Sequence, residues 1–325
     1  RLICGRADVG MPGGSRKVLA GGVLNGVPRI FALNCDPALD FGQIGIREGA
    51  ITGAADQIHV ALSGRGGHTS RPHLTEDRTF ALGALLTQLP AVLSRRFDPR
   101  AGASMVWGQV SSGNAANVIP SSGELAGTLR MLDAGAWHEA EHLVRGLISD
   151  IIEPYGVSAK ITYVRGVPPV VNDFGATQSL RQAVSGSIGP SGVATTLQSL
   201  GGEDFAWYLE SIPGAMGRLG TRTPDGPTYD LHQGNLRIDE RSIAVGAKVL
   251  VDAFNRGAAP APYNKVGFGG TTIAAVYVDE NRGATKQVPE LGRVYGRAKL
   301  DAVGGDAGAG VGAGPFHSQS NEAWF

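Results

Sequence analysis

The chain has 325 residues, enough for one large domain or two ordinary ones. Lys+Arg and Asp+Glu both number 29, so the net charge is zero, which argues against nucleic acid or an anionic membrane as the main partner. No apolar run approaches the roughly 18–20 residues of a membrane span. Two cysteines cannot form a disulfide framework, and the chain begins at Arg1 without a secretory leader, so we expect a cytoplasmic protein.

The first half of the chain carries regular strand and helix signals. An apolar run at residues 29–33 predicts a buried strand. Alternation of apolar and polar residues predicts a strand at 57–63, and apolar residues at helical spacing predict a helix over 75–93 with Thr75 as its N-cap. The pattern then predicts strands at 103–110 and 124–132, a helix at 134–153 and a strand at 157–164.

That order is β-α-β-β-α-β within about 110 residues, the ferredoxin-like split unit. We therefore expect one antiparallel four-stranded sheet with both helices on one face.

The second half predicts a further α/β segment, followed by a tail. After a linker at 167–169 we expect a helix at 173–185, a strand at 192–197, a helix from Gly201 to about Pro213, a strand at 215–219 and an amphipathic helix at 239–254. Residues 258–325 hold irregular glycines and one strand signal at 273–278, and we expect a disordered Gly-rich tail there. No Lys-Ser/Thr pair follows these glycines, so they do not indicate a phosphate loop.

Two groups of residues of metal-binding types also have a purely structural interpretation. His138 and His142 lie four residues apart on a predicted helix, a spacing that can bind zinc when further ligands are present. Their acidic neighbours are typical of a solvated helix face. Cys4 and Cys35 could offer thiolates, but their spacing does not favour this over inert buried cysteines.

Four segments with candidate functional residues lie in loops or at strand ends of the predicted small domain and beyond it. Gly64-Arg-Gly-Gly-His-Thr-Ser-Arg-Pro-His73 follows the first strand, where glycines allow a tight turn that exposes polar side chains. Gly113-Asn-Ala-Ala-Asn-Val-Ile-Pro120 fills another loop, and Gly127-Thr-Leu-Arg130 ends the next strand. His232 lies in a loop before the last strong helix.

In these motifs the chain resembles the aminoacylase/carboxypeptidase-type metallohydrolases, in particular the branch of the hippurate and indole-acetyl-amino-acid amidohydrolases. The similarity runs from about residue 1 to 257. Residues 64–73 look like the family's Gly-x-Gly-Gly-His-x-x-x-Pro-His, and residues 117–130 look like its Asn-Val-Ile-Pro…Gly-Thr-x-Arg. Residues 201–205 look like its Gly-Gly-Glu-Asp-Phe, and residues 229–240 look like its late-His segment.

The resemblance implies a catalytic domain with two zinc or manganese ions, interrupted by a ferredoxin-like lid that also forms a homodimer. Metal-bound water then attacks an amide carbonyl while a Glu takes the proton. The implied domains are a remnant of the catalytic domain at 1–53, the lid and dimerisation domain at 54–166, the other half of the catalytic domain at 167–257 and a low-complexity tail at 258–325.

The resemblance also implies roles for individual residues. His68 matches a lid histidine that reaches the partner subunit's active site and stabilises the oxyanion. Asn117 and Arg130 match contacts to the substrate's carbonyl and carboxylate, a role suited to the guanidinium fork. His232 matches the late metal ligand, and Asp8 lies where the catalytic Glu belongs.

The chain departs from the family pattern at the metal site. Val9 replaces a metal-ligand Glu, Asn34 replaces a metal-binding His, and the Cys-x-His ligands belong to a region upstream of Arg1. Asp8 is one methylene shorter than the family's base. We therefore expect an N-terminally truncated, degenerate amidohydrolase of N-acyl amino acids such as hippurate-like amides, impaired or inactive and without its metals. The alternative is a non-catalytic protein that dimerises through its lid.

Overall fold

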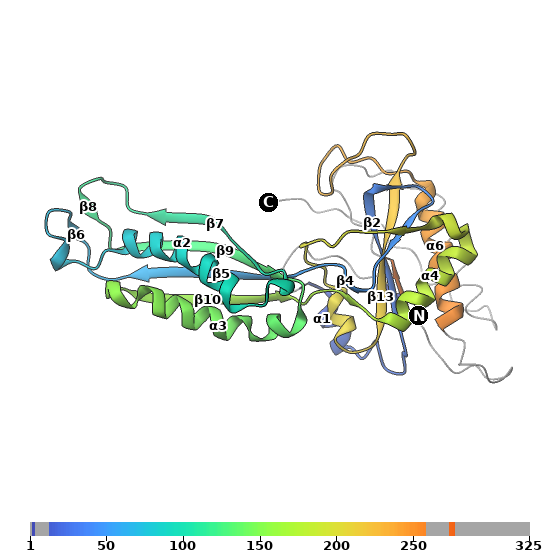
Figure 1. Ribbon diagram of the computed structural model, residues 1–325, viewed down its shortest axis with the longest axis horizontal. Coiled ribbons are helices and arrows are strands. Elements are labelled where there is room, and N and C mark those ends of the chain that lie inside the picture. The colour runs from blue at the N-terminus through green and yellow to red at the C-terminus, as the bar shows by residue number, and fades with distance from the viewer. Residues whose placement is uncertain (1, 4–12, 258–272, 277–325) are drawn as a thin grey trace, which may run out of the picture. The chain divides into compact units, whose positions relative to one another are not determined.

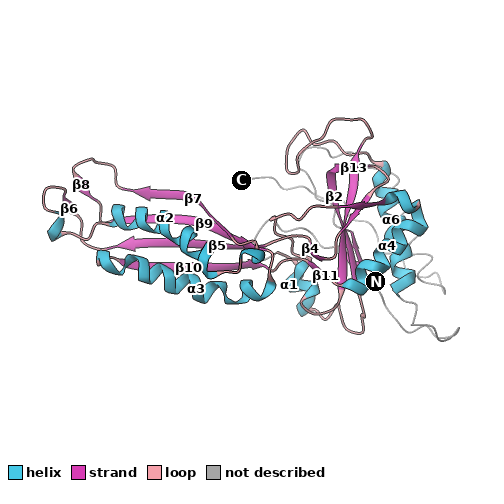
Figure 2. Ribbon diagram, viewed as in Figure 1, coloured by secondary structure: helices cyan, strands magenta, loops and turns pink. Residues whose placement is uncertain are grey.

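The computed structural model describes residues 2–3, 13–257 and 273–276, and Figures 1 and 2 show its helices and strands. The fold is mixed α/β, as the sequence predicts. Asp8 and the expected tail, apart from residues 273–276, lie outside the described residues. Within the described part, no helix combines the length and apolar character needed to cross a membrane.

The larger of the two main sheets has six strands in the order β1-β14-β2-β13-β3-β12. All neighbouring strands in it run parallel except β13 and β3, which are antiparallel. The strands are β1 (Leu2–Ile3), β2 (Ile30–Asp40), β3 (Ile44–Ile46), β12 (Val193–Thr195), β13 (Gly214–Arg222) and β14 (Ile273–Val276). The strand predicted at residues 29–33 therefore extends to Asp40, and Asn34 lies within it.

Helices cover both faces of this sheet. On one face, helices α4 (Phe174–Ile188) and α6 (Arg241–Gly257) pack against Phe31, Leu33 and neighbouring apolar residues. On the other face, helices α1 (Ser15–Ala20) and α5 (Ala206–Leu209) pack against Ile30 and Ala32. Because side chains alternate along a strand, a strand buried on both faces reads as a continuous apolar run.

Between β3 and β11 (Val171–Asn172) the chain builds a second, inserted unit, which spans residues 54–167. It contains a four-stranded antiparallel sheet in the order β10-β5-β9-β7. A two-residue pairing of β4 (Gly49–Ala50) with β11 joins the two chain segments that enter and leave it. The elements, in chain order, are β5 (Ala54–Ser63), α2 (Arg78–Arg96), β7 (Ser104–Ser112), β9 (Ser122–Met131), α3 (Ala134–Ile152) and β10 (Ser158–Val167). Their order along the chain is the β-α-β-β-α-β order expected from the sequence.

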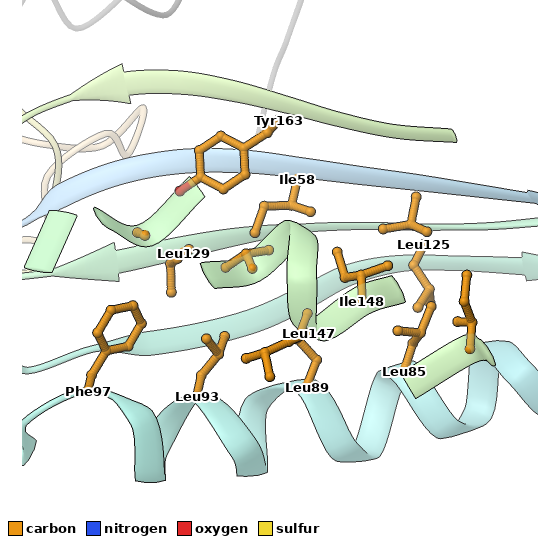
Figure 3. Packing of buried hydrophobic residues seen from close by; sticks show 14 of the residues in the cluster. Ile58, Leu85, Leu89, Leu93, Phe97, Leu125, Leu129, Leu147, Ile148 and Tyr163 are labelled. Atoms are coloured by element: carbon orange, nitrogen blue, oxygen red, sulfur yellow. The ribbon is translucent and has the colours of Figure 1, made fainter. Parts of the chain in front are cut away.

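The core of the inserted unit lies between this sheet and its two helices. Figure 3 shows Leu85, Leu89 and Leu93 of α2 directed toward the strands, with Leu147 and Ile148 of α3 beside them. Only one face of the sheet is covered by helices, as Figure 1 shows.

Three local expectations were wrong. The N-cap of α2 is Asp77, whose carboxylate accepts a hydrogen bond from the Phe80 backbone, and not Thr75. Phe80 is one of the apolar residues whose helical spacing predicts the helix over 75–93, which would place it in the core, but it is 65% exposed. The helix expected from Gly201 shrinks to the four residues of α5, because the two glycines at its start favour irregular backbone.

Candidate functional site

Polar side chains gather on the face of the larger sheet that α1 and α5 cover. Asn34 of β2 and Arg218 of β13 are paired in register. Glu203 comes from the loop before α5, and its carboxylate Oε2 accepts a hydrogen bond of 2.7 Å from the Asn34 amide Nδ2. The neighbouring Asp204 accepts a bond of 3.0 Å from the Ser15 backbone N–H, which ties the same loop to the start of α1. The loop that carries Gly-Gly-Glu-Asp-Phe thus joins α1 to the sheet.

The environment of Glu203 opposes its negative charge. Burial raises the pKa of the Glu203 carboxyl, and the nearby Asp204 raises it further. Hydrogen bonds from the Phe205 backbone and from Asn34, and the charge of Arg218, act in the other direction. Burial is the largest of these effects, so Glu203 binds a proton more readily than an ordinary glutamate.

Arg218 is a buried cation next to this pair. Its residue surface is only 8% exposed. Within the described part of the chain, the Arg218 guanidinium donates no hydrogen bond and forms no ion pair, although its charge acts on Glu203. Gly45 of β3 leaves room for it, since a Cβ at Gly45 would lie 3.3 Å from the Arg218 Cβ and 2.7 Å from the Thr196 Cβ.

The described residues do not fit a two-metal centre. In the described ranges no group of three or more His, Cys, Asp or Glu side chains is placed to hold an ion. Asn34, which the resemblance aligns with a histidine ligand, donates its amide to Glu203. The buried guanidinium of Arg218 beside it would repel a divalent cation. No catalytic step through a metal follows from these residues.

Two of the predicted site residues meet at one end of the inserted unit. There, β6 (Gly67–His68) pairs with β8 (Val118–Ile119), and the Thr69 N–H donates to the Asn117 carbonyl at 3.2 Å. The His68 ring is exposed, and its Nδ1 lies 2.8 Å from the Ser70 hydroxyl. We call the two loops at this end, residues 64–76 and 113–121, the tip.

Arg130 lies at the opposite end of the same sheet. It pairs in register with Ala55 at the start of β5, whereas Ser122 pairs with Ser63 at the end of β5. Eight residue steps separate Ser122 from Arg130, which is about 26 Å of strand. The Arg130 guanidinium donates to the Leu200 carbonyl at 2.7 Å, next to the loop that carries Glu203.

The remaining predicted histidines do not complete a site. His232 lies in an exposed loop after β13 with a positive φ of 64° and joins no metal-binding group among the described residues. His138 is exposed, and its ring contacts the Ala134 carbonyl and the Glu210 carboxylate at 2.6 and 3.6 Å. His142 is also exposed. The His138–His142 pair is therefore part of a solvated helix face, as the structural interpretation of this pair predicts.

Sequence reasoning missed Arg218 and gave Glu203 no role. A signal for Arg218 existed, because an arginine within the apolar stretch 215–219 stands out in a predicted buried strand. Glu203 lay within a motif that already carried the resemblance. The pairing of β2 with β13 brings Arg218 next to Asn34, and the loop before α5 brings Glu203 to it.

The fold and the site define a class: an α/β layered protein that is interrupted by an antiparallel unit whose tip and base carry polar residues. A family model described as "Peptidase family M20/M25/M40" matches residues 6–256. The chain therefore belongs to this family, in agreement with the resemblance seen in the sequence.

Two sequence relatives and one solved structure illustrate the family. The chain is 46% identical over 251 residues to a Rhodococcus jostii (strain RHA1) protein that bears the name glutamate–cysteine ligase 2-3, covering 77% of this chain and 32% of that protein. It is 32% identical over 239 residues to N-acetylcysteine deacetylase of Bacillus subtilis (strain 168), covering 74% of this chain and 61% of that enzyme. The structure of the Bacillus subtilis YXEP protein, a dinuclear metal binding peptidase from M20 family, superposes with a TM-score of 0.60 and 29% identity, covering 74% of this chain and 60% of that one.

Proposed function

We propose that the chain binds N-acyl amino acids and hydrolyses their amide bond weakly or not at all. The observation that carries this proposal is the combination of family membership with the Asn34–Glu203 hydrogen bond at the position of a histidine ligand. One relative is named for the deacetylation of N-acetylcysteine, which makes small N-acyl amino acids the first ligands to examine. The chain spans less than two thirds of these relatives, so their activity enters only as part of this proposal.

Within this proposal the inserted unit is a lid that recognises the ligand. Arg130 suits the ligand carboxylate, because a guanidinium can donate two parallel hydrogen bonds to it. Asn117 and His68 suit the amide carbonyl, where an amide N–H and an imidazole N–H can donate. An N-acyl amino acid spans about two residues of extended chain, roughly 7 Å. It cannot touch both Arg130 and the tip of one chain, which lie about 26 Å apart along the strand.

The proposal therefore requires two copies of the chain, with the tip of one completing the site of the other. Strand β7 is suited to join them, because it is an edge strand that contains neither a charged residue nor a proline. Its Val106 and Val110 are exposed. The opposite edge, β10, carries Lys160 and Arg165, which discourage pairing with another strand.

The reason for weak hydrolysis is chemical. An amide carbonyl needs an activated water and a group that stabilises the developing oxyanion. His68 and Asn117 can supply the second function, but the described residues do not fit the metals that would activate water. Asp8 is shorter than the base it replaces, and a displacement of about 1 Å costs on the order of a hundredfold in rate.

The test combines binding and turnover. Isothermal titration with hippurate and N-acetyl-L-cysteine should show binding to the chain, and amine release with added Zn²⁺ or Mn²⁺ should stay at least about a hundredfold below that of the Bacillus subtilis deacetylase. Absence of binding for every N-acyl amino acid would refute the proposal. Rapid hydrolysis with stoichiometric bound metal would refute the assignment of weak activity.

Mixed dimers test the role of the second copy. A dimer of one His68→Ala chain and one Arg130→Ala chain has one site with both residues intact only if the tip acts on the partner's site. We expect each mixed dimer to bind one ligand, while either variant alone binds weakly. If the mixed dimer binds no more ligand than either variant alone, the tip of one chain does not complete the site of its partner.

A further inference from the structure

Arg218 carries a positive charge in the candidate site that no contact with a described residue explains. Burying a guanidinium that makes no hydrogen bond is costly, and buried arginines in proteins are normally paired. Only 8% of the Arg218 residue surface is exposed, and among the described residues its guanidinium has no hydrogen-bond partner. Its nitrogen atoms are not among the fully buried, unpaired polar atoms, so solvent reaches them. Arg78, which is fully buried, donates to the Pro120 and Glu76 carbonyls. Among the described residues, Arg218 is thus a largely buried cation whose solvent-accessible nitrogens have no protein acceptor.

The surroundings of Arg218 direct its guanidinium into the site. Asn34 is its register partner on β2, so both side chains leave the sheet on the same face. That face carries Met216 toward α1 and α5, whereas Ala215 and Leu219 belong to the core under α4 and α6. On the other side of β13, Gly45 has no side chain, and the place of its Cβ is filled by Thr196 and Leu39, whose Cβ and Cδ1 lie 2.7 and 2.8 Å from it.

We propose that Arg218 binds a carboxylate of the ligand, in addition to the one that Arg130 would bind, so that the site selects N-acyl amino acids with a second acidic group. This inference rests on the proposed function and names its substrate class. A carboxylate would supply the acceptors that the guanidinium lacks, in the bidentate geometry that arginine favours.

Glu203 is an acid hydrogen-bonded to Asn34 beside Arg218, and its environment limits the repulsion of a ligand carboxylate. Its carboxylate already accepts a hydrogen bond from Asn34, and it forms no ion pair with Arg218 among the described residues. Burial and Asp204 raise the pKa of Glu203, which reduces its negative charge near the ligand. No described residue thus accepts a hydrogen bond from the Arg218 guanidinium, which leaves its donors available for an external anion.

The test uses two ligands that differ only in a side-chain carboxylate, N-acetyl-L-glutamate and N-acetyl-L-glutamine. We expect the wild-type chain to bind N-acetyl-L-glutamate at least about tenfold more tightly in isothermal titration, as one charge-assisted bidentate contact would give. Arg218→Met should abolish this preference while leaving the affinity for N-acetyl-L-glutamine unchanged. Equal affinities in wild type, or a preference that persists in Arg218→Met, would overturn the inference.

Control variants keep the test decisive. Arg222→Met removes an arginine from the same strand that already pairs with Asp40, and it should retain the preference. If Arg218→Met does not fold, the doubly neutral Arg218→Met/Glu203→Gln chain replaces it, because it leaves no uncompensated acid. If wild type binds neither N-acetyl compound, the proposed function fails. Titration with glutarate then tests separately whether Arg218 binds a carboxylate. Glutarate binding that Arg218→Met abolishes supports the assignment, and its absence in wild type refutes it.

Discussion

Asp56 is a buried carboxylate that joins three segments of the inserted unit, and its removal should be strongly destabilising. Only 1% of its surface is exposed. It accepts hydrogen bonds from the Trp137 indole at 3.0 Å, from the Tyr163 hydroxyl at 2.6 Å and from the Gly166 backbone at 2.9 Å. The donors come from α3 and from two positions along β10, so one side chain fixes the helix to the sheet.

The magnitude follows from these three bonds. A buried donor left without an acceptor costs about 1–3 kcal/mol, so Asp56→Ala should cost about 4 kcal/mol of unfolding free energy. Tyr163→Phe removes a single bond to the carboxylate and should cost about 2 kcal/mol. Burial and the Asp56 hydrogen bond both raise the pKa of Tyr163, so the hydroxyl keeps its proton and remains a donor.

Urea unfolding followed by tryptophan fluorescence and circular dichroism measures both variants. Asp150→Ala, at an exposed position of α3, serves as the control and should stay within about 0.5 kcal/mol of wild type. In the double variant Asp56→Ala/Tyr163→Phe the two costs should not add, because both remove the same bond. A cost below about 1 kcal/mol for Asp56→Ala, or full additivity, would refute this account of the contact.

Three further outcomes are expected. The folded state raises the pKa of Glu203, so it holds that proton more tightly than the unfolded chain does. The free energy of unfolding should therefore fall as the pH rises from the ordinary pKa of 4.5 through the folded pKa. Glu203→Gln should remove this fall in urea titrations at several pH values, and an unchanged pH dependence would contradict the raised pKa. Leu85→Ala should cost about 3 kcal/mol and Leu86→Ala less than about 1 in thermal unfolding, since Leu85 is fully buried and Leu86 is 37% exposed, and equal costs would contradict the orientation of α2. After zinc loading and desalting, metal analysis should find almost no zinc in wild type, because no group of three or more metal-binding side chains is placed to hold an ion among the described residues. Stoichiometric zinc in wild type would contradict this expectation.

The sequence by itself determined the elements of the inserted unit and the family. Period-two alternation in β5 and helical spacing in α3 are local signals, because each element buries one face against a common core. The motifs around His68 and Asn117 could also be recognised in the sequence, because glycines and polar residues in a turn form a local pattern that does not depend on the rest of the chain. Even so, the cap of α2 and the exposure of Phe80 depended on packing that spacing alone does not specify.

Only the tertiary structure decided what surrounds Asn34. Glu203 lies 169 residues further along the chain, and Arg218 reaches Asn34 through the pairing of β13 with β2. The distance of about 26 Å between Arg130 and the tip likewise follows from strand register, which places the two ends of β9 at opposite ends of the sheet. Sequence spacing cannot supply either fact, because strand pairing joins segments that are distant in the chain and fixes which side chains share a face.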